Sequence, residues 1–271
     1  MPELPEVETT KRGIEPYISK KKINSIYVSK YDLRIKFNKS KKNNILNKKI
    51  EGVRRRAKYI LIDFSNSYSL LIHLGMTGNL RIADTLSLGK HDHMAFSLNS
   101  KKHLIYNDVR RFGLILIIKK GQRNKLLENN GPDPFEKSAD YKYLHKKIEK
   151  SKATIKSILL NNRIISGIGN IYACEILFSS KISPLKLGSS ITHDECKIIL
   201  KNSKKILKKA INSGGTTLND YLNADAKPGY FKIQLNVYDR ESEDCKKCSQ
   251  KIKRIIQNGR STFFCSKCQL K

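Results

Sequence analysis

Four cysteines near the end of the chain most restrict what it can fold into. Cys245 and Cys248 form one Cys-x-x-Cys pair, and Cys265 and Cys268 form a second pair after residues 249–264. Each pair can place two thiolates on one metal ion from a tight turn, and two pairs complete a tetrahedron. Because four thiolates close such a site, its ion would fold the segment rather than activate water. The spacing therefore predicts one structural Zn2+.

The segment around these cysteines is strongly basic. Its cations are Lys246, Lys247, Lys251, Lys253, Arg254, Arg260, Lys267 and Lys271, and no acid follows Asp244. We expect a β-hairpin that presents cations to a phosphate backbone, with Arg260 near the turn in residues 258–262. The other two cysteines, Cys174 and Cys196, lie on helical faces and are predicted to be small core residues.

The charge balance of the whole chain indicates a polyanionic partner. Lys and Arg number 54 against 24 Asp and Glu, a formal net charge of +30. Drift in an AT-rich coding sequence accounts for part of the lysine, but so large an excess is more typical of a nucleic-acid-binding protein. No apolar run approaches the ~18 residues of a membrane span, and the acidic N-terminus is unlike a signal peptide. We expect a cytoplasmic protein in a reducing compartment, where disulfides are disfavoured.

Hydrophobic periodicity divides the chain into a strand-rich half and a helical half. Helical spacing predicts a first helix that ends near residue 17. Alternation predicts strands at 23–28, 33–37, 93–98, 104–109 and 114–118, and a hairpin of 53–64 with 68–74 around Asn66. These segments predict a β-sandwich with one flanking helix over residues 1–131. Gly131 and Pro132 then open a linker over residues 132–150.

The second half is predicted to be helical up to the cysteine-rich end. We expect a short helix over 153–160, two turns over 161–169 and a second helix over 170–178, within a domain of residues 151–235. Thr192 and Glu195 form a capping box that starts a longer helix. Its predicted apolar face is Cys196, Ile199, Ile206 and Ala210, and Gly214 and Gly215 end it. Residues 213–231 show no clear period, and residues 236–271 form the zinc finger.

The first residues of the chain suggest a nucleophile. Removal of Met1 would leave Pro2 as a free secondary amine, and an α-amino group has a pKa of about 8 against ~10.4 for lysine. Its attack on an aldehyde-type carbon gives an iminium that cannot lose a proton, so the charge stays as an electron sink. Glu3 adjoins this amine and Glu6 follows one helical turn later, so two carboxylates can divide acid and base roles. The alternative is an ordinary helix start, with Pro5 at the first position and acids near the positive end of the dipole.

These segments together resemble the bacterial formamidopyrimidine-DNA glycosylases over nearly the whole chain. Besides the cysteine-rich end, the motifs are Pro-Glu-Leu-Pro-Glu-Val-Glu-Thr at 2–9, His-Leu-Gly-Met-Thr-Gly at 73–78, Lys-His-Asp-His at 90–93, Asn-Asp-Val-Arg-Arg-Phe-Gly at 107–113 and Ser-Gly-Ile-Gly-Asn-Ile-Tyr-Ala at 166–173. The resemblance implies an α+β clamp. Its parts are an N-terminal β-sandwich with a flanking helix and a C-terminal helix–two-turn–helix domain with a β-hairpin zinc finger, with DNA crossing the cleft between them.

The resemblance also implies an activity in base excision repair. The family excises oxidised purines (oxoguanine and formamidopyrimidines) from double-stranded DNA and then cleaves the strand at the abasic site. By resemblance, Pro2 attacks C1′ to form a Schiff base and Glu3 supplies the proton. Lys58 assists the first elimination, and Arg260 is tied to the second. The family needs one structural Zn2+ but no nucleotide cofactor and no membrane. We expect a monomer associated with the bacterial nucleoid.

Further positions match DNA contacts of the family. Met76, Arg110 and Phe112 match residues that fill the hole left by a flipped base. Core packing is the alternative for Met76 and Phe112, but the neighbouring Gly75 and Gly113 favour exposed turns. The remaining matches are His91, Lys152, Lys156 and Asn170. Asn170 begins a helix, where free amides favour a phosphate, and Lys152 lies in a lysine-rich stretch that aligns in more than one way. Residues 216–230 correspond to a flexible cap over the flipped purine.

Three alternatives stay open from the sequence. The sister enzyme endonuclease VIII, which prefers oxidised pyrimidines, typically has Gly where this chain has Leu4 and lacks the Arg-Arg-Phe-Gly motif. A non-catalytic zinc protein that grips damaged DNA predicts indifference to Pro2. A ribosome- or RNA-associated protein explains the charge and the zinc but not the N-terminal acids. Two positions depart from the family pattern: Asn258 replaces a small residue or glutamine and could shift the finger tip, and Cys174 replaces Ser or Asp.

Overall fold

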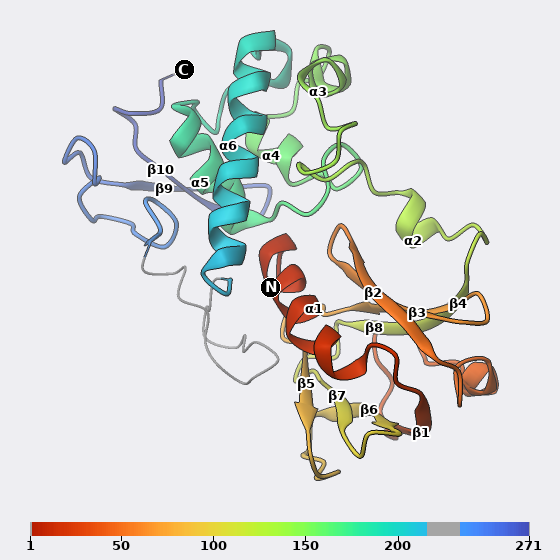
Figure 1. Cartoon of the computed structure of the whole chain (residues 1–271). Coiled ribbons are helices and arrows are strands. Elements are labelled where there is room, and N and C mark those ends of the chain that lie inside the picture. The colour runs from red at the N-terminus through yellow and green to blue at the C-terminus, as the bar shows by residue number, and fades with distance from the viewer. Residues whose placement is uncertain (1, 216–233, 271) are drawn as a thin grey trace. The chain divides into compact units, whose positions relative to one another are not determined.

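The protein consists of two compact units, seen in a computed structural model that describes residues 2–215 and 234–270. One unit is Met1–Lys125 with Ile211–Lys232, and the other is Leu126–Ala210 with Ile233–Lys271 (Figure 1). The cap expected over residues 216–230 lies outside the described residues.

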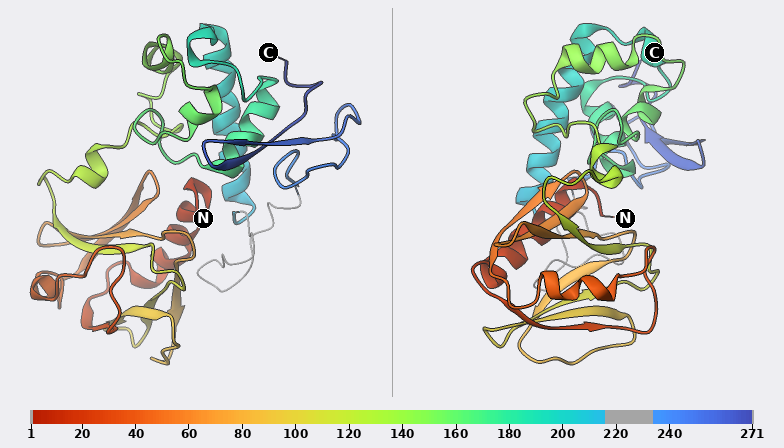
Figure 2. Two further views of the ribbon diagram at one scale, coloured as in Figure 1. Left: turned by 180° about the vertical axis from the view of Figure 1, so that it is seen from behind. Right: turned by 90° about the vertical axis from the view of Figure 1, so that its right-hand side faces the viewer.

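Two antiparallel four-stranded sheets form the sandwich of the N-terminal unit. One sheet has the order β2-β3-β4-β8 and the other the order β1-β6-β7-β5 (Figures 1 and 2). The strands are β1 (Ile23–Val28), β2 (Ile50–Arg56), β3 (Tyr59–Phe64), β4 (Tyr68–His73), β5 (Asn79–Ala83), β6 (Asp92–Leu98), β7 (His103–Asn107) and β8 (Leu114–Lys119). Helix α1 (Leu4–Ile18) packs against β2, β3 and β5. The short 3-10 helix η1 (Lys39–Asn44) contacts β8.

One hydrophobic core joins the two sheets and the helix. Val7 and Ile14 of α1 belong to the same buried cluster as Phe64 of the first sheet and Phe96 and Tyr106 of the second. Burying several aromatic side chains removes a large apolar area from water, the main force that stabilises such a unit. The predicted sandwich with a flanking helix is confirmed.

Three strand predictions need correction. Residues 33–37 form no strand: Leu33 and Phe37 are buried but Ile35 between them is exposed, so the expected alternation is not realised. Residues 53–64 belong to two strands rather than one, because Ala57 has φ +53° and turns the chain between β2 and β3. Strand β5 was not predicted, because its five residues are too few for a clear period.

The second unit is mainly helical. Its helices are α2 (Lys125–Glu128, which begins at the boundary), α3 (Tyr141–Ile148), α4 (Ile155–Leu159), α5 (Asn170–Ser180), the short η2 (Gly188–Ser190) and α6 (His193–Asn212, which ends beyond the boundary). Residues 132–150, expected to form a linker, contain α3, and the helices α4 and α5 flank the turns at 161–169. Helix α5 is buried on nearly all sides and contacts both α4 and β10. This arrangement confirms the predicted helix–two-turn–helix.

Helix α6 begins with the expected capping box and presents a slightly different face. The Thr192 N–H donates to the Glu195 carboxylate at 2.9 Å, and the Glu195 N–H donates to the Thr192 hydroxyl at 3.2 Å. Its buried residues are Cys196, Ile199, Leu200, Ser203, Leu207 and Ala210. Ile206 is only half-buried, so the prediction of Ile206 was wrong by one residue and Leu207 takes its place. Gly214 and Gly215 have positive φ angles, as the predicted helix stop requires.

The zinc-finger segment ends in a two-stranded hairpin. Strands β9 (Lys253–Gln257) and β10 (Arg260–Phe264) pair antiparallel, with Arg260 opposite Gln257. Asn258 and Gly259 have φ values of +48° and +71°. Two central residues with positive φ make the type I′ turn that matches the twist of a hairpin, and Asn-Gly is its favoured sequence. Asn258 therefore supports the finger tip rather than displacing it. Among the described helices, none is long and apolar enough to cross a membrane.

Candidate active site and nucleic-acid-binding elements

The N-terminus brings two buried carboxylates next to Pro2. Glu3 is the N-cap of α1, and its N–H donates to the Glu6 carboxylate at 2.8 Å. Glu3 and Glu6 are each only 2% exposed, and Pro2 is buried beside them in the chain. The capping box thus fixes both carboxylates at the helix start, where the dipole favours their charge. This is the acid pair that the sequence placed beside the N-terminal amine.

An ion pair anchors this helix start to the sandwich. Glu8 accepts from Arg12 on its own helix and from Arg55 of β2, both at 2.9 Å. Burial alone would raise the pKa of Glu8, but the hydrogen bonds from the two guanidinium groups outweigh it and lower that pKa. The charged carboxylate therefore joins α1 to β2, which carries the chain on to Lys58.

Lys58 lies in the β2–β3 turn and is only 6% exposed. Lys58 is therefore neither exposed nor part of a strand. Beside it, burial and the charges of Arg34 and Lys58 lower the pKa of His73 to about 3, so this histidine is neutral at physiological pH. His73 Nδ1 accepts from the Gly75 N–H at 3.0 Å, which leaves the ring proton on Nε2. His73 lies within the motif at residues 73–78, but no feature of the sequence indicates a role for it.

The loops that carry Met76 and Phe112 are held against each other by Asp108. The buried Asp108 carboxylate accepts from the Thr77 hydroxyl at 2.6 Å, from the Gly113 N–H at 2.8 Å and from the Tyr106 hydroxyl at 3.1 Å. Thr77 in turn accepts from the Arg110 N–H at 3.1 Å. One carboxylate thus joins residues 74–78 to residues 108–113.

Glycine allows this close approach. Gly75 has φ +64°, and a Cβ there would overlap the backbone of Phe112 and Gly113. A Cβ on Gly113 would overlap the Tyr106 hydroxyl. Both glycines of the sequence motifs are therefore needed where the two loops meet.

The tips of these loops expose apolar side chains. Met76 is 37% exposed and Phe112 is 44% exposed, so core packing is wrong for both. The Arg110 guanidinium carbon lies 4.7 Å from the centre of the Phe112 ring. We call residues 109–112 the wedge loop. His91 is half-buried beneath this loop, and its carbonyl accepts from the Asp108 N–H at 3.0 Å.

In the second unit, two expected DNA contacts serve the hairpin. Lys156 is 1% exposed, and its ammonium donates to the Ser261 carbonyl at 2.9 Å and to the Thr262 hydroxyl at 2.7 Å. Asn170 donates to the same Ser261 carbonyl at 2.9 Å. These bonds account for the burial of Lys156, and its place near a damaged base stays a prediction. Lys152 is exposed between α3 and α4.

These and two further bonds hold the turn end of the hairpin in place and leave Arg260 exposed. Asn258 donates to the Ser157 hydroxyl of α4 at 2.9 Å, and Gln257 reaches the Pro184 carbonyl at 3.3 Å. Arg260 itself is exposed in the first position of β10. The turn and its ties therefore set the direction of this one cation.

The segment leading into the finger is held by Glu175, which the sequence reading missed. This residue is 2% exposed, and its carboxylate accepts from the N–H groups of Asn236, Val237 and Tyr238 at 2.8 to 3.0 Å. A single acid in the apolar helix of residues 170–180 was the available signal, since a buried carboxylate needs donors.

The four cysteines form the ligand set for one zinc ion. Their Sγ atoms all lie within 4.8 Å of one another, and the Cys245–Cys268 and Cys248–Cys265 distances are 3.9 and 3.5 Å. Four thiolates at Zn–S distances of about 2.3 Å lie roughly 3.8 Å apart in a tetrahedron, so the sulfur positions fit. The Cys268 N–H donates to Cys265 Sγ and the Lys247 N–H to Cys245 Sγ, which orients these ligands. Cys174 packs against this cluster, so it is a core residue as predicted.

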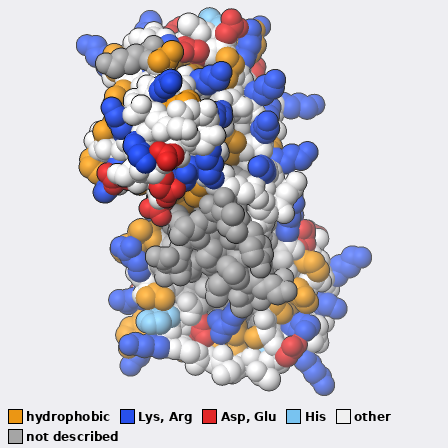
Figure 3. Space-filling model, turned by 90° about the vertical axis from the view of Figure 1, so that its left-hand side faces the viewer, with side chains coloured by type: hydrophobic (Ala, Val, Ile, Leu, Met, Phe, Trp, Pro, Cys, Tyr) orange, Lys and Arg blue, Asp and Glu red, His pale blue; other side chains and the backbone are white. Residues whose placement is uncertain are grey.

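The excess of Lys and Arg appears on the surface of the protein. Lys and Arg side chains project from many places on the face shown in Figure 3 and do not gather in one patch.

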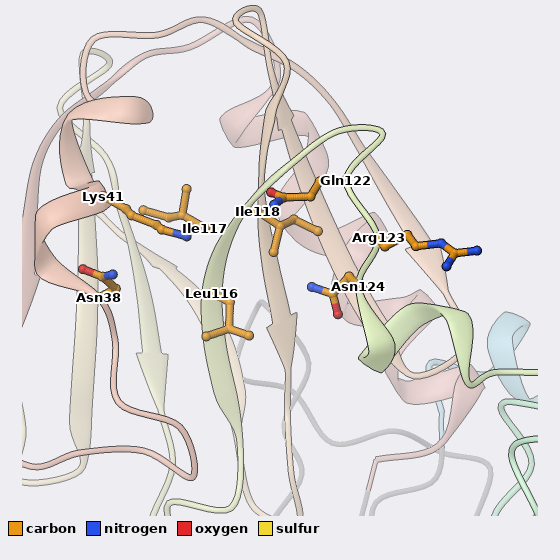
Figure 4. A pocket seen from close by; sticks show the side chains of 8 residues that line it. All are labelled: Asn38, Lys41, Leu116, Ile117, Ile118, Gln122, Arg123 and Asn124. Atoms are coloured by element: carbon orange, nitrogen blue, oxygen red, sulfur yellow. The ribbon is translucent and has the colours of Figure 1, made fainter.

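A cavity of about 270 Å³ lies beside β8 (Figure 4). It is lined by Asn38, Lys41, Leu116, Ile117, Ile118, Gln122, Arg123 and Asn124. None of the predicted site residues lines this cavity.

Known proteins match this chain over nearly its whole length. Family models match the N-terminal domain of formamidopyrimidine-DNA glycosylase at residues 1–115, its H2TH domain at 130–221, and the zinc finger found in FPG and IleRS at 242–270. The formamidopyrimidine-DNA glycosylase of Rickettsia felis is 45% identical over 271 residues, which is 99% of this chain and 98% of that protein.

Solved structures give the same result. Wild-type Lactococcus lactis Fpg in complex with DNA that contains N7-benzyl-Fapy-dG is 34% identical, with a TM-score of 0.90 over 100% of both chains. The same protein with DNA that contains an abasic site has a TM-score of 0.89 at 34% identity, over 99% of this chain and 100% of that one.

Proposed function

Because the chain belongs to the formamidopyrimidine-DNA glycosylase family of DNA repair enzymes, we propose that it excises oxidised purines from double-stranded DNA and then cleaves the strand. The observation that carries the proposal is the pair of carboxylates, each 2% exposed, fixed by a capping box next to Pro2. A zinc protein that only grips DNA could use these acids to start its helix, but it would be indifferent to a change of Pro2.

In the proposed reaction, the lesion is first rotated out of the duplex, since C1′ is out of reach within the stack. The Pro2 nitrogen attacks C1′, the base departs with a proton, and Glu3 supplies a proton as the sugar ring opens. The resulting iminium acidifies the C2′ hydrogen. Loss of that proton breaks the bond to the 3′ phosphate, and a second elimination releases the 5′ phosphate and leaves a gap.

Other residues are assigned to the later steps and to DNA binding. Lys58, whose charge helps to lower the pKa of His73, is assigned to the first elimination. Arg260, exposed at the hairpin tip, is assigned to the second elimination and to phosphate binding. Met76, Arg110 and Phe112 fill the hole left by the flipped base. The zinc ion holds the fold of the finger, and the substrate places the enzyme with the bacterial chromosome in the cytoplasm.

Borohydride trapping tests the proposal. The wild-type protein and Pro2→Gly are incubated with an oxoguanine duplex and sodium borohydride, and the DNA-linked band is measured by denaturing electrophoresis. We expect a covalent band for the wild type and none for Pro2→Gly, which still binds the duplex. Equal strand cleavage by both proteins would contradict the proposal. Parallel duplexes with formamidopyrimidine and thymine glycol separate purine from pyrimidine specificity.

A further inference from the structure

Tyr31 lies beside the wedge loop, and none of the sequence motifs includes it. It is 49% exposed in the segment that follows β1. The guanidinium carbon of Arg111 lies 5.5 Å from the centre of the Tyr31 ring, within the range of a cation–π contact. The ring of His93 meets the same tyrosine edge-on, with centroids 6.4 Å apart and planes at 88°. Tyr31 therefore contacts both the wedge loop and the strand beneath it.

His93 connects the segment of Tyr31 to the root of the wedge loop. This histidine is 3% exposed, and its carbonyl accepts from the Ser29 N–H at 2.9 Å. Its Nε2 lies 3.0 Å from the Asp108 carbonyl, which can only accept, so Nε2 carries the proton. Nδ1 and the Tyr31 carbonyl both lie 3.1 Å from the Ser29 hydroxyl, whose one proton they share. Two segments far apart in the sequence are thus joined through one imidazole.

Arg111 is the residue of the wedge loop that most needs such support. It has φ +56°, a left-handed conformation that non-glycine residues rarely adopt. Its N–H donates to the Asp108 carbonyl at a long 3.3 Å. Its side chain contacts Tyr31, whereas the side chain of the preceding Arg110 lies over Phe112. The left-handed residue therefore separates the two arginine side chains.

We propose that Tyr31 is a positioning residue: by holding Arg111 in its left-handed conformation, it directs Arg110 and Phe112 toward the DNA. The inference rests on the proposed function, because it assumes that these two side chains enter the duplex. Tyr31 takes no part in the chemistry at Pro2. Its effect is on the fraction of bound complexes in which the wedge is inserted.

The test measures insertion separately from binding and from chemistry. A duplex carries a tetrahydrofuran abasic analogue, which the enzyme cannot cleave, next to a 2-aminopurine whose fluorescence rises when its neighbour is unstacked. Tyr31→Ala is compared with Tyr31→Phe, which keeps the ring, and with Tyr27→Ala. Tyr27, on β1, is 42% exposed and serves as the matched control.

We expect Tyr31→Ala to lower the insertion equilibrium about two- to fivefold, the effect of an exposed cation–π contact of ordinary strength. The affinity for undamaged duplex should stay within about twofold of wild type, since the phosphate contacts remain. Tyr31→Phe should restore the fluorescence change, and Tyr27→Ala should match the wild type. An unchanged fluorescence response in Tyr31→Ala would overturn the proposal, as would an equal loss in Tyr31→Phe.

The same proteins distinguish this proposal from the one on which it rests. In one outcome, the wild type forms a borohydride-trapped complex and Tyr31→Ala shows an unchanged fluorescence response. That outcome rejects only the positioning role. Wild type that neither traps nor changes the fluorescence rejects the proposed function, and the positioning role with it.

Discussion

The buried carboxylate of Glu175 gives the sharpest stability prediction. Its oxygens accept from three successive backbone N–H groups, and Oε2 also accepts from the Asn236 side chain at 2.9 Å. In Glu175→Gln, Oε1 can still accept from the N–H groups of Asn236, Val237 and Tyr238. The new NH2 group takes the place of Oε2, however, so it faces the side-chain NH2 of Asn236 and cannot accept from it.

The size of the effect follows from that geometry. A hydrogen bond to a charged acceptor contributes about 1.5–3 kcal/mol, and a buried donor without an acceptor costs about 1–3 kcal/mol. The variant loses the charge of the acceptor and places two NH2 groups, that of the new glutamine and that of Asn236, against each other. The second unit should therefore be destabilised by about 2–4 kcal/mol. The first unit should keep its stability, because Glu175 lies in the core of the other unit.

Urea unfolding with two probes checks this. Zinc release into a colorimetric chelator follows the finger, and loss of β-sheet signal in circular dichroism follows the sandwich. The matched control is Glu149→Gln, the same change at an exposed residue that follows α3, which should stay within about 0.5 kcal/mol of wild type. A Glu175→Gln protein whose zinc-release midpoint equals that of the control would refute the reasoning.

Three further predictions concern charge and metal. The lowered pKa of Glu8 means that its ion pairs stabilise the fold above the ordinary value of 4.5 and are lost as pH falls through the lower folded-state value; Glu8→Gln should therefore lose stability at neutral pH and show a flatter acid limb in pH-dependent melting. If about six phosphates are neutralised, the logarithm of DNA affinity should fall with a slope near −5 against the logarithm of salt concentration, and a flat response in a titration would contradict the phosphate contacts. Chelation of zinc should abolish DNA binding before the sandwich unfolds; simultaneous melting of both units, followed by circular dichroism, would show the finger to be needed for the whole fold.

Elements with a short-range signal were predictable from the sequence. The two Cys-x-x-Cys pairs identified the zinc ligands, because each pair meets its ion from one turn. The capping box at Thr192 and the Asn258–Gly259 turn were readable for the same reason: the residues that make them are neighbours in the chain. The helical period did not identify every buried residue exactly. It predicted that Ile206 is buried, whereas the buried residue is Leu207.

Contacts between distant segments were decided only by the tertiary structure. The ammonium of Lys156 donates to Ser261 and Thr262, residues that no local period of the sequence connects to it. The pairing of Tyr31 with Arg111 likewise depends on which strands the sandwich brings together. A sequence determines local conformation through neighbours along the chain. The environment of a charged side chain, and so whether it meets DNA or the protein itself, is set by packing over the whole unit.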